Sequence, residues 1–265
     1  MVVALLIIGG GAYAYYEHNQ NKAIDNQQVS EYQPQTTTTP AGSTPLTQGG
    51  DNTQPAATST PQTTQPVNSS STTTNPTPMT CQRNFDQNKL NTAKVDIKNK
   101  TVEFNVKDFG IIKLALYDQD APKTVENFLR LVNSGYYDCL TFHRVAKGFV
   151  IQGGDPNGNG TGGISAFGDK FADELNAETP SYKAGYVKGV LAMANSGPNT
   201  NGSQFFIMLG DNTSLPHAYS IFGKVSAGLD VVDKIGQVDI TPGFGPTDGT
   251  PKTPVVIEKA TITSK

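Results

Sequence analysis

The feature that most limits how this chain can fold is a low-complexity stretch at residues 17–80. Thr, Pro, Gln, Asn and Ser dominate it, as in the run T-T-T-T-P-A-G-S-T-P at residues 36–45. Such a composition cannot bury enough apolar surface to offset the entropy of ordering the chain. We expect a disordered linker with local polyproline II character and a root-mean-square reach of about 45 Å. A packed core must therefore come from residues 81–265.

Residues 1–16 form a separate segment that is almost entirely apolar. A membrane-spanning helix needs about 20 apolar residues, and a secretory signal carries a basic region before its apolar one, so the segment fits neither role completely. We expect the natural sequence to start upstream. An uncleaved membrane anchor is the preferred interpretation. A signal peptide cleaved near Ala14, after the small-x-small run at residues 12–14, is the alternative, and a buried segment of the globular domain is the third.

The charge and the histidine content exclude several classes of function. The formal net charge is −3 over 265 residues, and no basic tract marks a nucleic-acid surface. The three histidines, His18, His143 and His217, are not part of a close cluster with Cys or Asp, so we expect no metal site. We interpret His143 as a packed, hydrogen-bonded ring and His217 as an exposed loop residue.

Residues 81–265 carry the hydrophobic patterns of a mainly β domain. Residues 102–106 and 112–116 alternate between apolar and polar, which predicts half-buried strands. Pro122 suits the first turn of a helix that ends near residues 134–135, and a second helix is predicted at residues 229–235. The buried face of the first helix consists of Val125, Phe128, Leu129 and Val132. Many short strands, the last at residues 255–257, with only two helices favour a β-barrel or sandwich.

Two stretches combine a cation with amide and aromatic side chains. Residues 142–155 read F-H-R-V-A-K-G-F-V-I-Q-G-G-D, and residues 193–207 read M-A-N-S-G-P-N-T-N-G-S-Q-F-F-I. The guanidinium of Arg144 and the amide of Gln152 suit carbonyl groups, and their apolar neighbours suit a nonpolar ring. Ser203 lacks the His and Asp partners of a hydrolase triad. The pattern therefore indicates binding or conformational catalysis.

At these stretches the chain closely resembles the cyclophilins, a family of peptidyl-prolyl cis/trans isomerases. The resemblance covers residues 94–263 and includes A-P-K-T-V-E-N-F at residues 121–128, G-T-G-G at residues 160–163 and I-F-G-K-V at residues 221–225. It implies a closed eight-stranded antiparallel β-barrel capped by two α-helices, and an isomerase that requires no cofactor or metal. With the apolar segment and the Thr/Pro-rich linker, we expect a bacterial-type member.

The resemblance also implies which residues form the site. Arg144, Phe149 and Gln152 match catalytic positions of the family. Substrate-binding positions are matched by Val150, Gly160, Ala194, Asn195, Gln204, Phe206, Leu215 and Tyr219. Val150 stands where many relatives have methionine, and Tyr219 where many have histidine. From the residues alone, the alternative for Arg144 is a surface or structural ion pair. The alternatives for the others are ordinary core packing for the apolar residues, turn and strand-end hydrogen bonds for Gln152 and residues 194, 195 and 204, and a plain flexible turn at residues 160–163.

These observations lead to an expected function outside the cytoplasm. We expect a monomer that isomerises X-Pro bonds in extended or unfolded polypeptides and so assists their folding. A single N-terminal anchor would hold it at the cell membrane, or signal cleavage would release it. A module that grips proline-containing segments without turnover, and a structural surface protein, are the alternatives. Because the chain lacks Trp and Ser214 matches the rim of the pocket, we expect weak cyclosporin binding.

The two cysteines, Cys81 and Cys139, are the only ones in the chain. Outside the cytoplasm they could form a disulfide that joins the start of the domain to the segment before Phe142. Two unpaired thiols are the alternative, because a sequence does not supply the required geometry.

Overall fold

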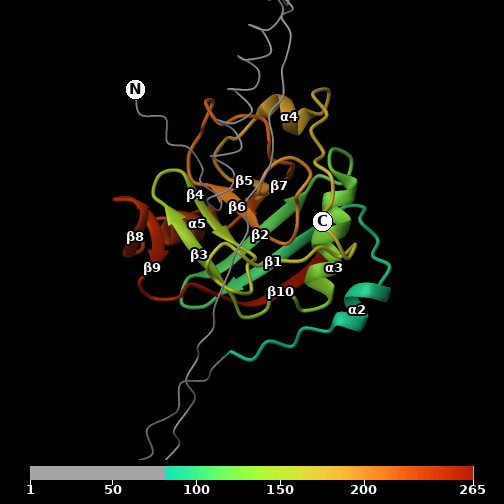
Figure 1. The fold of residues 1–265 in the computed structure, drawn as a ribbon, viewed down its shortest axis with the longest axis horizontal. Helices are drawn as coiled ribbons and strands as arrows, with labels where there is room; N and C mark the ends of the chain where they lie inside the picture. Colours follow the sequence, from blue (N-terminus) through green and yellow to red (C-terminus); the bar gives the residue numbers. More distant parts are fainter. Residues whose placement is uncertain (1–80, 265) are drawn as a thin grey trace, which may run out of the picture. The chain divides into compact units, whose positions relative to one another are not determined.

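The part of the chain that can be described is built from short strands and four helices (Figure 1). The computed structural model describes residues 81–264. Its helices are α2 (Gln87–Thr92), α3 (Pro122–Asn133), α4 (Pro180–Ala184) and α5 (Leu229–Ile235). Its strands are β1 (Lys100–Val106), β2 (Gly110–Leu116), β3 (Leu140–Ala146), β4 (Val150–Gly153), β5 (Val190–Met193), β6 (Phe205–Met208), β7 (Ile221–Ala227), β8 (Ile240–Gly245), β9 (Asp248–Pro251) and β10 (Val256–Ser264).

Eight of these strands close into a barrel. They follow one another in the order β10-β1-β2-β7-β5-β6-β4-β3, and pairing of β10 with β3 through Val256 and Thr141 closes the ring. Every pairing is antiparallel. The predicted eight-stranded antiparallel barrel is confirmed. The hairpin of β8 and β9 was not predicted, and it joins the ring from outside, where Gly249 pairs with Val145 of β3.

The barrel interior is filled by the alternating apolar residues of its strands. On β1, Val102, Phe104 and Val106 are buried, so the predicted period of two is confirmed there. An aromatic group lies at the centre of the core. The ring centroids of Phe104, Phe128, Tyr137 and Phe205 are 5.1 to 6.1 Å apart. Burial of each such side chain stabilises the fold by about 1.5–3 kcal/mol.

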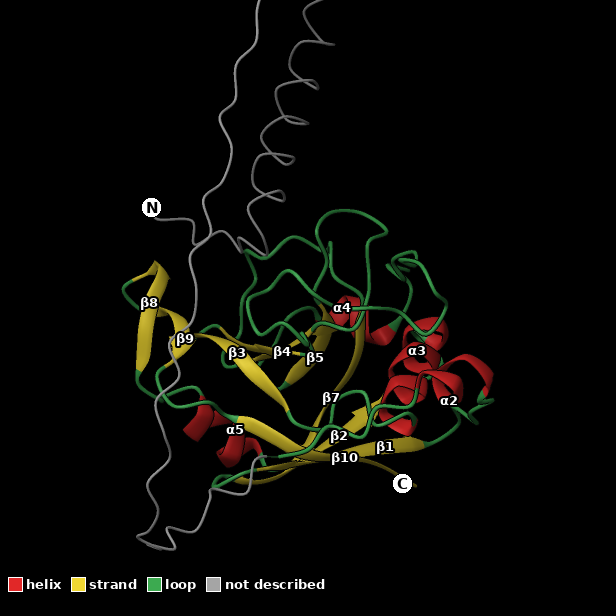
Figure 2. Cartoon of the chain, turned by 60° about the horizontal axis from the view of Figure 1, so that its bottom comes forward, coloured by secondary structure: helices red, strands yellow, loops and turns green. Residues whose placement is uncertain are grey.

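Helices α3 and α5 cover opposite sides of the barrel (Figure 2). Pro122 occupies the first turn of α3, as predicted, and Ser134 caps the other end through its backbone N–H. Helix α5 has the predicted bounds and buries Val231, Val232 and Ile235. The sequence did not predict α2 and α4, which have only six and five residues and begin at side-chain caps from Asp86 and Thr179.

The segment before β1 is tied to the barrel by covalent and polar contacts. Cys81 and Cys139 form a disulfide with a Cα–Cα distance of 5.6 Å. The Arg83 guanidinium lies 4.6 Å from the ring centre of Tyr136, and its Nε donates to the carbonyl of the same residue at 3.2 Å. These contacts fix residues 81–92 against the end of α3 and the turn that follows it.

Within residues 81–264, no helix has the length and apolar character that crossing a bilayer requires. The apolar segment of residues 1–16 and the linker of residues 17–80 lie outside the described residues.

Candidate active site

Strands β4, β5 and β6 are buried on both faces of the barrel wall. Their outward-facing residues form a second apolar group outside the core. Along β4 and β6, Ile151 and Ile207 point into the barrel core, whereas Val150 and Phe206 belong to this second group. We call it the outer apolar cluster. It consists of Ala146, Val150, Tyr186, Val190, Ala192, Ala194, Phe206, Met208, Leu215 and Ile221.

A β-bulge in β3 turns Arg144 away from the core. Phe142 pairs with Gly153, but Arg144 pairs with Gln152, so β3 advances two residues while β4 advances one. Without the extra residue, Arg144 would share the inward face of Phe142. Bulges often redirect side chains next to active sites. Here the bulge places Arg144 beside Gln152, and the strand returns to the core at Val145.

His143 is the extra residue of this bulge, and one prediction about it was wrong. Its ring is packed and buried as expected, but neither ring nitrogen has a hydrogen-bond partner among the described residues. Burial lowers the pKa of His143 from 6.5 to about 4, and the positive charge of Arg144 acts in the same direction, whereas the Asp155 carboxylate opposes it. The histidine is therefore neutral near pH 7.

The buried His143 should make folding stability depend on pH. Between about pH 4 and 6.5 the unfolded chain binds a proton at His143 that the folded protein does not, so stability is complete above about 6.5 and falls as the pH falls toward 4. The slope contributed by this group is at most about 1.4 kcal/mol per pH unit. Denaturant unfolding across this range measures it. His143→Leu should remove that share of the slope, and an equal slope in both proteins would contradict the assignment.

A chain of hydrogen bonds links the polar residues of the site. Arg144 Nη1 donates to Gln152 Oε1 at 3.1 Å, and Gln152 Nε2 donates to Gln204 Oε1 at 2.9 Å. Gln204 Nε2 then donates to the carbonyls of Gly160 and Gly162 at 2.9 and 2.7 Å. Because each amide both accepts and donates in this chain, the orientations of both glutamines are fixed. The bonds also fix the loop of residues 160–162 relative to Arg144.

Aromatic residues line the apolar side of the site. Phe206 and Tyr219 meet edge to face with ring centres 5.6 Å apart. The Tyr186 hydroxyl donates to the Tyr219 carbonyl at 2.9 Å and accepts from its N–H at 3.0 Å, which holds Tyr219 in place. Burial raises the pKa of Tyr219, and the positive charge of Arg144 opposes that shift. Phe149 and Tyr219 are only half-buried and leave ring surface for a ligand.

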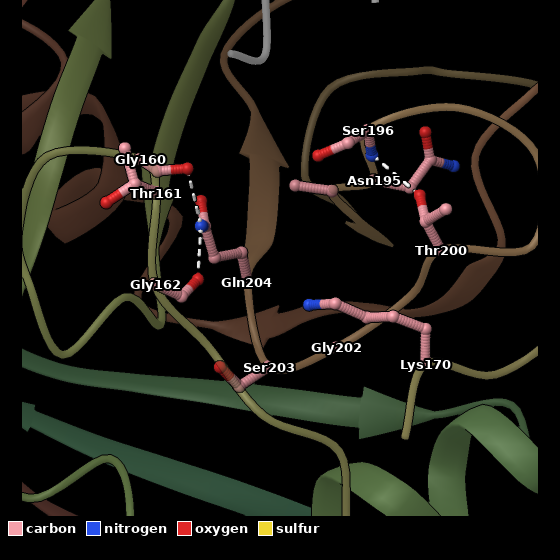
Figure 3. A pocket seen from close by; sticks show the side chains of 11 residues that line it. Gly160, Thr161, Gly162, Lys170, Asn195, Ser196, Thr200, Gly202, Ser203 and Gln204 are labelled. Atoms are coloured by element: carbon pink, nitrogen blue, oxygen red, sulfur yellow. Dashed lines mark hydrogen bonds between the residues drawn. The ribbon is translucent and has the colours of Figure 1, made fainter. Parts of the chain in front are cut away.

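A polar pocket, shown in Figure 3, adjoins the outer apolar cluster, because Ala194 belongs to both. Figure 3 shows the Gln204 amide bonded to the loop at Gly160 and Gly162 on one wall, with Asn195 on another. Asn195 Nδ2 donates to the Ala218 carbonyl at 2.9 Å, so this side chain supports the neighbouring loop. Ala194 also lines the pocket, and its N–H donates to the Gln204 carbonyl at 2.9 Å.

Comparison with known proteins identifies the family. The family model described as "Cyclophilin type peptidyl-prolyl cis-trans isomerase/CLD" matches residues 101–262. The chain belongs to this family.

Relatives of this cyclophilin come from diverse organisms. Peptidyl-prolyl cis-trans isomerase CYP18-2 of Arabidopsis thaliana is 48% identical over 129 residues, which cover 49% of this chain and 76% of that protein. Peptidyl-prolyl cis-trans isomerase-like 1 of Homo sapiens is 47% identical over 139 residues, which cover 52% of this chain and 81% of that protein. The crystal structure of a cyclophilin-type isomerase of Cryptosporidium parvum superposes with a TM-score of 0.56 at 36% identity and covers 63% of this chain and 98% of that one. The chain described here is an isomerase of this type.

In the structure of this chain, the predicted site residues lie in two adjoining groups. The polar group consists of Arg144, Gln152, Gln204, Gly160 and Asn195, and Ala194 of the outer apolar cluster adjoins it in the pocket lining. The apolar group consists of Phe149, Val150, Phe206, Leu215 and Tyr219. Val150, Phe206 and Leu215 are buried, so they support the surface, and the half-exposed rings form its accessible part.

Sequence reasoning missed two residues of this cyclophilin site. Tyr186 holds Tyr219 from a distant segment, and nothing in its local sequence distinguishes it from a core tyrosine. Asp248 of β9 accepts two hydrogen bonds from Arg144, at 2.8 Å from Nε and 2.6 Å from Nη2. The only signal for Asp248 was an acidic residue in a Gly/Pro-rich turn, which usually indicates a solvated loop.

Proposed function

We propose that this cyclophilin accelerates rotation about X-Pro bonds in extended or unfolded polypeptides, and that it assists protein folding outside the cytoplasm. The observation that carries the proposal is the position of Arg144. Its guanidinium donates to Gln152 at 3.1 Å, and Gln152 pairs across β4 and β6 with Phe206, which packs on Tyr219. Arg144 therefore lies at the border between the polar group and the aromatic surface. A peptide with an X-Pro bond is complementary to this arrangement, because its backbone carbonyls suit the polar group and its proline ring suits the aromatic surface.

The chemistry follows from the electronic structure of the amide. Resonance gives the peptide bond a rotation barrier of about 18–20 kcal/mol. Twisting the bond pyramidalises the prolyl nitrogen and localises its lone pair, which can then accept a hydrogen bond. A guanidinium N–H donated to that nitrogen stabilises the twisted state more than either planar state, and this is differential binding of the transition state. No proton is transferred, so the neutral His143 has no acid-base role.

Arg144 retains donors for this task. A guanidinium has five N–H donors. Within residues 81–264, Nε and Nη2 donate to Asp248 and Nη1 donates to Gln152, which uses three of them. A rate gain of about 10⁵ corresponds to roughly 7 kcal/mol. One charge-assisted hydrogen bond contributes about 1.5–3 kcal/mol of this, and placement of the proline ring against Phe149 and Tyr219 contributes to orientation.

Three features support a place outside the cytoplasm. The disulfide between Cys81 and Cys139 is of a kind that persists mainly in oxidising compartments. The apolar residues 1–16 suit an anchor or a signal, and the linker of residues 17–80 suits a tether between a membrane and a folded domain.

A related structure supports the substrate class. The cyclophilin-type isomerase of Cryptosporidium parvum has also been crystallised in the presence of the dipeptide Ala-Pro, and that structure is 36% identical to this chain with a TM-score of 0.55. Proline-containing peptides are therefore the substrates that we propose for this chain.

Two experiments test the proposal. The full-length chain, at catalytic concentration, should speed cis-to-trans conversion of a short X-Pro peptide in a protease-coupled assay. A module that only grips proline-containing segments would leave the rate unchanged. For the location, protease added to intact cells should digest the protein, and a thiol reagent should not label Cys81 or Cys139 before reduction. A protein protected from the protease, with two reactive thiols, would contradict the proposed location.

The rim of the apolar surface predicts weak cyclosporin binding. Ser214 is exposed and its N–H donates to Asn212 Oδ1 at 3.0 Å, directly before Leu215 of the outer apolar cluster. Ser214→Trp should bury roughly 60–80 Å² more apolar surface against the drug, which at about 25 cal/mol per Å² gives about tenfold to thirtyfold tighter binding. Calorimetric titration measures the change. Turnover of a short peptide should stay nearly constant, and unchanged drug affinity would contradict the rim assignment.

A further inference from the structure

The hairpin of β8 and β9 is not needed to close the barrel, because the ring closes through the pairing of β10 with β3. It pairs with β3 beyond the point where β10 ends its own pairing, so one edge of β3 is shared by β10 and β9. Within β8, only Ile240 is buried, and an isolated two-stranded hairpin is marginal in water. The hairpin therefore contributes little to the core. Figures 1 and 2 show it beside β3, the strand that carries Arg144.

Asp248, at the start of β9, accepts hydrogen bonds from the guanidinium of Arg144 with both carboxylate oxygens. Oδ1 accepts from Nε at 2.8 Å and Oδ2 accepts from Nη2 at 2.6 Å. Such a bidentate pair fixes the plane of the guanidinium as well as its position. The Arg144 side chain is 6% exposed and the Asp248 side chain 21%, so water competes weakly at the arginine end of the pair.

Two further contacts complete the enclosure of the guanidinium. Gln152 on β4 accepts from Nη1 at 3.1 Å, on the opposite edge of β3 from the hairpin. The ring of Phe244 on β8 lies with its centre 5.2 Å from Arg144 Cζ. Phe244 is 55% exposed, so the hairpin also places an open aromatic ring beside the guanidinium. Asp248, Gln152 and Phe244 together thus restrict rotation about the terminal side-chain bonds of the arginine.

We propose that Asp248 is a positioning residue for isomerisation: it holds the Arg144 guanidinium so that its two uncommitted N–H groups point in one direction. This inference rests on the proposed function. Removing Asp248 leaves the charge of Arg144 but releases its orientation. Pairing with a carboxylate also weakens the guanidinium as a donor, which opposes the benefit. Orientation outweighs this cost, because misplacement of a reacting group by about 1 Å can reduce rates by 10²-fold.

The test separates turnover from binding. Asp248→Ala in the full-length chain should lower kcat for an X-Pro peptide by about 10- to 30-fold, within the range that misorientation produces. KM should stay within about threefold, because the aromatic surface that receives the proline ring is untouched. Asp248→Glu retains a carboxylate and should recover most of the lost turnover. Asp230→Ala, which removes the same charge from an exposed ion pair with Lys234 on α5, should behave as wild type.

A nuclear magnetic resonance signal provides a readout that does not depend on activity. The Nε–H of Arg144 is bonded to Asp248, so it should give a sharp resonance that exchanges slowly with water, and Asp248→Ala should broaden it while barrel amide signals stay in place. A kcat in Asp248→Ala that equals or exceeds that of wild type would overturn the inference, as would a loss confined to KM. A wild-type protein without isomerase activity would refute the proposed function instead, whereas the Arg144 resonance would still report the contact.

Discussion

Arg144→Ala should lower turnover of X-Pro peptides by about 10²–10³-fold while the barrel stays folded, which is the usual effect of removing one preorganised donor. The side chain is nearly inaccessible to solvent, so its charge acts in a site from which most water is excluded. The variant leaves Gln152 and the aromatic surface in place, and peptide binding should weaken much less than turnover. Progress curves from the protease-coupled assay, fitted for kcat and KM, measure both effects.

Two variants control for this result. Arg144→Lys keeps the charge but cannot donate to Asp248 and Gln152 in the geometry of a planar fork, so its turnover should lie between those of wild type and Arg144→Ala. Arg130→Ala removes another largely buried arginine, one that donates to the Leu90 carbonyl at 2.7 Å and belongs to α3. It should leave turnover intact. A folded Arg144→Ala protein with turnover within about threefold of wild type would exclude Arg144 from the mechanism.

Replacing both cysteines with serine should lower the free energy of unfolding by about 4 kcal/mol, because the disulfide closes a loop with a sequence separation of 58 residues. That loss corresponds to a fall of about 8–16 °C in Tm for a domain of this size. The loop entropy of the unfolded chain supplies most of the effect. The folded protein should change little, since Arg83 still packs on Tyr136 and the Asp86 N–H still donates to the Ser134 carbonyl.

The reduced wild-type protein is the matched comparison for the double serine variant. A reductant should destabilise wild type by a similar amount and leave the variant unaffected. Chemical denaturation with and without the reductant measures both effects, and turnover at 25 °C should stay within about twofold of wild type throughout. An unfolding midpoint that is the same in all four samples would show that the bond does not form in the protein as produced.

Local sequence patterns predicted the elements whose buried face follows from the periodicity of their own residues. The alternation of residues 102–106 and the apolar face of α3 needed only their own periodicity. Gln152 and Gln204 were both predicted as site residues from the two motif stretches, and they meet because Gln152 lies on β4 and Gln204 directly precedes β6, which pairs with β4.

The rest depended on contacts that periodicity does not encode. Phe142 and Val145 are both core residues, a spacing of three that breaks the strand period and was the one available sign of the bulge at His143. The partnership of Arg144 with Asp248 spans 104 positions in the chain. It exists only because β3 accepts a second strand on an edge already used by β10, and no local pattern reports that an edge is shared.

The position of the disulfide determines how the domain would carry a mechanical load. The chain before residue 81 joins the described part at Cys81, which is bonded to Cys139, one residue before β3 begins. A pull along that preceding chain would pass through the sulfur atoms directly to β3. The covalent path of the load would bypass residues 82–138, which include α2 and α3. The load would arrive at the strand that bears Arg144, where pairing with β4, β9 and β10 resists displacement.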